Sequence, residues 1–162
     1  MRWNDWFEKW GMTKLLIKPP FMEMEIVPKK ADRDAAYDMY IELVSRITTQ
    51  FLPIESGSDK TAADSIYAIF PATRDITKKH GRDAVEFAKL AITILNQIIR
   101  PFTTKWHAAL LTDNLSEVEH ARFRAELDSL RAALRVYIKM LADMAEIDEF
   151  TLGEKDGAND SF

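Results

Sequence analysis

The chain has 162 residues, a formal net charge of −4, 47% hydrophobic residues and no cysteine. This length and composition fit one soluble domain, and the lack of cysteine excludes disulfides and thiolate chemistry. The acidic balance argues against a nucleic-acid binder, because no excess positive charge is available for phosphates. We predict a cytoplasmic protein, since the first residues contain no secretory signal.

The first ten residues contain an aromatic stripe. Four aromatic residues recur at the three- and four-residue steps of one helical face: Trp3, Trp6, Phe7 and Trp10. Gly11 is suited to end this short helix. The stripe can pack onto the rest of the molecule as a lid, anchor a protein partner, or attach the chain to a membrane surface. We rank the membrane third, because Asp5 and Glu8 lie on the polar face.

Residues 13–30 predict a small β-hairpin or an extended arm. Met22, Met24 and Ile26 alternate with glutamates at the period of a strand, and two prolines at 19 and 20 favour a turn. A two-stranded hairpin is marginal alone, so this segment must lie on the helices.

From residue 31 to residue 80 the apolar residues follow a helical period. Pro53 stops the first of these helices. The next has a cap at Ser58 or Asp59, and Pro71 should kink or briefly break it. Gly81 follows three basic residues and is suited to end it.

The most apolar stretch is Ala84–Phe102, which predicts a buried central helix. The predicted buried face consists of Ala84, Phe87, Ala88, Ala91, Ile94, Leu95, Ile98 and Phe102. Polar residues interrupt the stretch well short of the roughly 20 apolar residues that a bilayer requires. We expect Pro101 to bend this helix without ending it.

A loop and helix cap at 113–116 lead to the last predicted helix, which runs to Ala145 with a nearly heptad apolar pattern. Residues 148–162 predict a disordered acidic tail. The fold class is therefore all-α: residues 1–147 form a single domain, with the aromatic helix and arm in 1–30 and an antiparallel four-helix bundle in 31–147.

The sequence predicts no catalytic residue, no metal site and no cofactor. Glu117 and His120 have the Glu-x-x-His spacing of di-iron bundles, but a second copy is absent. The segment 57–61 lacks the glycines of a phosphate loop.

Polar residues that interrupt the apolar helices form a candidate ligand site. The candidates are Arg46, Arg74, Asn96, Arg100, Lys105 and His107. One interpretation is a structural network in which Arg100 pairs with Asp38 or Asp75, since a partly buried arginine needs a partner. The other is a site for an anionic or phosphate-bearing ligand.

The order of several segments resembles a family of small bacterial helical proteins. The segments that carry the resemblance are WFEKWGMTKL, DRDAAYDMYIELVSRITTQ, TAADSIYAIFPATRDITKKHG, ILNQIIRPFTTKWH and FRAELDSLRAALRVYIKMLADMA. The resemblance covers about residues 3–147 and implies an accessory component of bacterial conflict or defence loci. It implies no catalytic residue, because no activity is assigned to the family.

The leading functional hypothesis is a non-enzymatic helical module that binds a protein partner or itself. The aromatic stripe would supply the side chains that anchor the partner. A ligand-sensing or enzymatic bundle at the polar strip around Arg100 is the alternative, and attachment to a membrane surface is the third.

Overall fold

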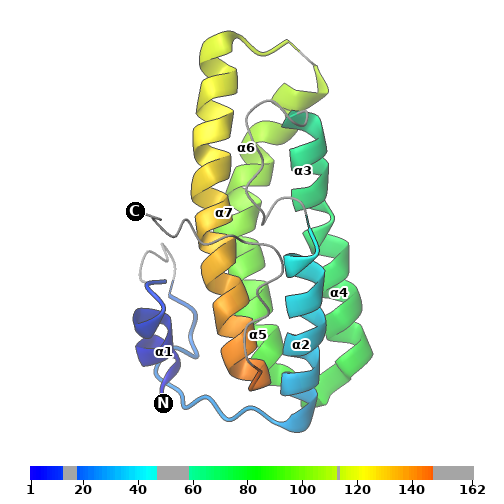
Figure 1. The fold of residues 1–162 in the computed structure, drawn as a ribbon. Coiled ribbons are helices and arrows are strands. Elements are labelled where there is room, and N and C mark those ends of the chain that lie inside the picture. The colour runs from blue at the N-terminus through cyan, green and yellow to red at the C-terminus, as the bar shows by residue number, and fades with distance from the viewer. Residues whose placement is uncertain (13–17, 47–58, 113, 148–162) are drawn as a thin grey trace, which may run out of the picture.

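The computed structural model describes residues 1–12, 18–46, 59–112 and 114–147. Within these ranges the regular elements are all helices, which confirms the all-α class. Figure 1 shows the helices between residues 30 and 145 running along a common axis, with the short first helix beside them. No helix in the described ranges is long and apolar enough to cross a membrane.

The aromatic stripe forms a helix, α1 (Trp3–Lys9), as predicted. Gly11 follows it with a φ of 73°, a conformation that favours glycine. Residues 18–29 form an extended arm. The arm is tied to the start of the chain by backbone hydrogen bonds from the N–H of Trp3 to the carbonyl of Met24 and from the N–H of Asn4 to that of Met22, at 3.0 and 2.8 Å. Of the two predicted forms, the described part of this segment has the arm. Residues 13–17 lie outside the described ranges.

Helix α2 (Lys30–Val44) follows the arm, whereas the predicted stop at Pro53 and the cap at Ser58 lie outside the described residues. Helices α3 (Asp59–Tyr67) and α4 (Ile69–His80) are separated at Ala68, three residues before Pro71. Proline has no N–H to continue the helical ladder, so the predicted break is confirmed. Gly81, with a φ of 67°, ends α4 as predicted and begins a short 3₁₀ turn, η2 (Gly81–Asp83).

The central helix consists of α5 (Val85–Ile94), a π-helical turn η3 (Leu95–Ile99) and α6 (Arg100–Leu111), so it continues through Pro101 as predicted. In the π turn the N–H of Arg100 bonds the carbonyl of Leu95, five residues earlier. This wider turn changes the phase of the buried face. Ile99 is buried, whereas Ile98 is partly buried and packs against the core, so both residues contribute to the buried face.

The last helix is α7 (Glu117–Ala145), which ends where predicted. The Ser116 hydroxyl accepts a hydrogen bond from the N–H of Glu119, and the Glu119 carboxylate accepts one from the N–H of Ser116. This reciprocal pair caps the helix. Helix α2 packs mainly against α7 and α4, and α3 packs against α6.

Candidate functional site

The segment from Arg100 to His107 directly follows the π turn and contacts helices on two sides. Toward α7, Phe102 and Trp106 are buried, and their rings lie 5.6 and 5.3 Å from that of Phe123. π turns within α-helices frequently occur at functional sites. The segment therefore has a core-packing face toward α7.

The Glu126 carboxylate of α7 accepts hydrogen bonds from two side chains of this segment. The indole N–H of Trp106 donates to its carboxylate at 2.5 Å, and the ammonium of Lys105 donates to the other oxygen. Burial raises the pKa of Glu126, but these two hydrogen bonds outweigh burial and lower it. Lys105 is thus paired with Glu126 on the α7 side, and its part in a ligand site stays a prediction.

On the opposite side, the same segment contacts α3 and α4. The Tyr67 hydroxyl donates to the carbonyl of Thr103 at 2.9 Å, and the ring of His107 lies edge-on to that of Tyr67 at 5.2 Å. The guanidinium of Arg100 lies 5.0 Å above the ring of Phe70, within cation–π range. These contacts lie where α3 and α4 are interrupted, so two helix irregularities face each other.

Arg100 donates from Nε to the side-chain oxygen of Asn96 at 3.1 Å. Arg74 lies one turn after Phe70 on α4. Arg74 and Arg100 are both exposed, and neither forms an ion pair with any described residue. We call this surface the arginine seam; it consists of Tyr67, Phe70, Arg74, Asn96, Arg100 and His107.

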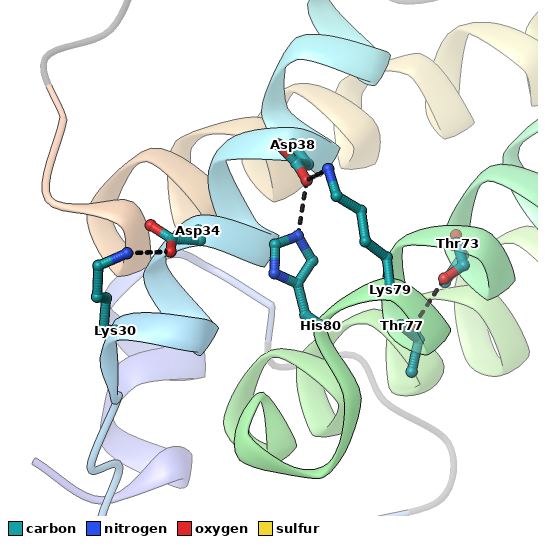
Figure 2. A network of polar contacts seen from close by, with 7 residues as sticks. All are labelled: Lys30, Asp34, Asp38, Thr73, Thr77, Lys79 and His80. Atoms are coloured by element: carbon teal, nitrogen blue, oxygen red, sulfur yellow. Dashed lines mark hydrogen bonds and ion pairs between the residues drawn. The ribbon is translucent and has the colours of Figure 1, made fainter.

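The structural interpretation paired Arg100 with Asp38 or Asp75, and neither ion pair occurs among the described residues. Asp38 instead accepts hydrogen bonds from Lys79 at 3.0 Å and contacts Nε2 of His80 at 2.7 Å (Figure 2). The guanidinium of Arg46 pairs with Glu42, one turn back on α2, at 2.8 Å. Arg46 therefore does not belong to the arginine seam as we define it.

The aromatic stripe faces the interior. Trp3, Trp6 and Phe7 are at most 5% exposed, and Trp10 is partly buried. The indole N–H of Trp6 donates to the Asp143 carboxylate of α7 at 2.7 Å. In this conformation the stripe is part of the core, which corrects its predicted use as a free anchor for a partner or a membrane.

Two histidine–aspartate contacts were not predicted. In addition to the His80–Asp38 contact, Nδ1 of His120 lies 2.5 Å from the Asp59 carboxylate at the start of α3. Both pairs connect helices that are distant in sequence, and no local motif indicates such partners. Near His80, the hydroxyl of Thr77 donates to the carbonyl of Thr73 (Figure 2), so it is not directed at the imidazole. Within the described ranges, no group of three or more His, Cys, Asp or Glu residues could hold a metal ion.

Comparisons of the chain with models of known protein families, with curated proteins and with solved structures found no match. The function proposed below is therefore argued from the geometry of the site.

Proposed function

We propose that this chain is a non-enzymatic helical module that binds the acidic segment of a protein partner, or a second copy of itself, through the arginine seam. The observation that carries the proposal is the pair of exposed arginines without a carboxylate partner among the described residues. Arginine is enriched among the residues that dominate protein interfaces.

The geometry of Arg100 supports this role. Its guanidinium is held between the ring of Phe70 and the side-chain oxygen of Asn96, so less conformational freedom is lost when an anion binds. The unused guanidinium nitrogens are suited to a carboxylate, which they can bind through two parallel hydrogen bonds. His107 and Arg74 extend the same surface along the helices.

The test compares Arg100→Glu and Arg74→Glu with Lys139→Glu, an exposed cation of α7 with the same charge change. After circular dichroism has shown that all variants fold, each is used for co-purification from the host, and its mass is measured by light scattering. A discrete partner or a larger assembly should be lost with the two seam variants and kept with Lys139→Glu. If all variants kept the partner or the larger assembly, the arginine seam would not be the interface. A wild-type chain that is alone and monomeric would contradict the module itself.

A second candidate function is the binding of a phosphate-bearing small molecule at the same seam. Arg100, Arg74 and His107 supply the donors that such a ligand needs. Pyrophosphate would then raise the melting temperature of the wild-type chain, and Arg100→Glu would abolish the rise. A partner protein that binds without any effect of pyrophosphate would favour the first proposal.

For the architecture, we propose an antiparallel four-helix bundle with α2, α3 with α4, the central helix and α7 as its four rods. The short connection at Gly81 and the antiparallel contacts of the seam support this arrangement. A cytoplasmic location remains our proposal from the sequence.

A further inference from the structure

The exposed side of the central helix is apolar at its start and basic further along. Val85 and Ile92 of α5 are 47% and 46% exposed, and the seven-residue step between them places them on one side of the helix. Asn96, which accepts a hydrogen bond from Arg100, is also exposed and lies about one turn after Ile92. We call this line the outer strip; it consists of Val85, Ile92, Asn96 and Arg100.

The charges on and beside the outer strip favour an anion. Between Glu86 and Asp113 the sequence contains no aspartate or glutamate, whereas Arg100 is exposed. Helices α3 and α4, which contact this part of the central helix, present three exposed cations and two exposed carboxylates: Lys60, Arg74, Lys78, Asp64 and Asp75. The described residues on this side of the fold therefore have a net positive charge.

The segment that follows the described part of α7 has the complementary composition. Residues 148–162, which lie outside the described ranges, contain five carboxylates and one lysine. This segment, which we call the acidic tail, therefore accounts for the whole formal net charge of −4. Its first part also contains two large apolar residues, Phe150 and Leu152.

The acidic tail begins close to the start of the outer strip. Pro28 of the arm lines a pocket together with Glu146, which follows the last residue of α7. The preceding residue of the arm, Val27, donates from its N–H to the side chain of Glu86 at 3.4 Å, and Glu86 follows Val85 in α5. In Figure 1 the orange end of α7 lies at this end of the bundle. The arm thus connects the end of α7 with the start of α5.

We propose that the acidic tail lies along the outer strip and occupies the arginine seam, where it competes with the acidic partner. The competition rests on the proposed function, whereas the contact of the tail with the seam does not. Arg100 lies about 22 Å from Val85 along the helix axis, at 1.5 Å per residue. An extended chain covers about 20 Å between Phe150 and Asp156. The lengths of the two segments therefore match.

The order of residues in the acidic tail matches the order along the outer strip. In an extended chain every second side chain lies on the same side, so Phe150 and Leu152 share one side with two carboxylates, Glu154 and Asp156. The apolar pair comes first, as Val85 and Ile92 do on the helix. The apolar side chains would then cover the exposed valine and isoleucine, and the carboxylates would pair with the arginines of the seam.

The contact should be partial, because exposed ion pairs are individually weak. Tethering to α7 gives the acidic tail an effective concentration at the seam on the order of millimolar. We expect it to occupy the seam for about half to four-fifths of the time. The apparent dissociation constant of a competing partner then rises about two- to fivefold, by the fraction of the seam that is left open.

The first experiment locates the acidic tail in the full chain. Because the chain has no cysteine, Ala158→Cys provides a single site for a nitroxide label. In NMR spectra the label should broaden the amide signals of Asn96 and Arg100, and 0.5 M salt should reduce the broadening. Broadening that is absent, or confined to other helices, would overturn the proposal. Broadening that passes from labelled chains to unlabelled ones would assign the contact to a second copy and overturn the intramolecular contact.

Two double variants with the same change of charge test the order of residues. Glu154→Lys with Asp156→Lys should remove the broadening. Asp148→Lys with Glu149→Lys should keep it, because these two residues directly follow the described end of α7 and cannot reach Arg100. Equal loss in both would overturn the proposal, since net charge alone would then hold the tail.

A hexaglutamate peptide serves as the acidic probe of the seam. Glu154→Lys with Asp156→Lys should bind it about two- to fivefold more tightly than wild type does, and Asp148→Lys with Glu149→Lys should show no such gain. An equal gain in both would overturn the competition. If the peptide bound at the seam without any broadening by the label, the proposed function would stand and the role of the tail would fall. Broadening without peptide binding would support the tail as occupant and contradict the acidic partner.

Discussion

The buried carboxylate of Asp32 joins the starts of two helices. One oxygen accepts a hydrogen bond from the N–H of Lys29 at 2.8 Å, at the beginning of α2. The other accepts one from the N–H of Phe87 in the first turn of α5, at 2.9 Å. Asp32 is 0% exposed and its bond to Phe87 is buried, so the N–H of Phe87 cannot exchange this partner for bulk water.

Asp32→Ala should therefore destabilise the fold by about 2–3 kcal/mol, because the buried N–H of Phe87 loses an ionised acceptor. For a chain of this size the melting temperature should fall by about 5–10 °C, measured by circular dichroism. Asp34→Ala is the control: it lies on the same helix, and its exposed pair with Lys30 should cost no more than about 0.5 kcal/mol. Equal losses for both variants would contradict the bridging role of Asp32.

Two tyrosines should respond in opposite ways to loss of their hydroxyl. Tyr137 is 1% exposed, and its hydroxyl has no hydrogen-bond partner among the described residues, so Tyr137→Phe should be neutral or stabilise the fold by up to about 1 kcal/mol. Burial also raises the pKa of Tyr137. Tyr67→Phe removes the bond to the carbonyl of Thr103 and should cost about 0.5–1.5 kcal/mol. Urea unfolding measures both; a clear loss for Tyr137→Phe would show that its hydroxyl has a partner.

The pair of Asp38 with His80 and Lys79 makes stability dependent on pH. Burial raises the pKa of Asp38, but the hydrogen bonds from His80 and Lys79 outweigh it and lower the pKa below its ordinary value. A lowered folded pKa stabilises the fold fully above the unfolded pKa of about 4, and this contribution is lost as the pH falls through the folded pKa.

Asp38→Asn should therefore cost about 1 kcal/mol at pH 7, and the difference from wild type should shrink steadily below pH 4. Urea unfolding at pH 7, 5 and 3 measures this. A difference that is constant across these values would mean that the charge of Asp38 does not matter.

Replacement of the strained residue at the end of α7 should increase the stability of the fold. Glu146→Gly should raise the free energy of unfolding by about 1 kcal/mol, because glycine adopts a φ of 55° without strain. Gly81→Ala should have the opposite effect and lower the free energy of unfolding by about 1 kcal/mol. Nothing lies within 4 Å of the added Cβ, so this loss would come from backbone conformation and not from a steric clash. Loss of stability in Glu146→Gly would contradict the strain at this position.

Sequence patterns predicted helix ends well, because an end depends on a few neighbouring residues. Gly11, Gly81 and the cap at Ser116 each follow from local backbone rules, and all three lie at observed helix ends. The π turn could not be predicted from apolar spacing, which assumes one period throughout. For this reason spacing alone does not predict that Ile99 is fully buried while Ile98 is only partly so.

The candidate site was predicted only in part, because periodicity shows which face a residue lies on but not what covers that face. Asn96, Arg100 and His107 do share an exposed side of the central helix. Lys105 bonds a glutamate that lies 21 positions away. The acceptor of the Trp6 indole is 137 positions away, which local spacing cannot indicate.

This separation also has a consequence for the order of folding during synthesis. Helix α1 emerges from the ribosome long before α7, yet the hydrogen bond of Trp6 requires Asp143, near the end of α7. The indole of Trp6 therefore has no access to this partner until almost all of the described chain has been translated. Until then this side of α1 is apolar surface that can associate with other chains.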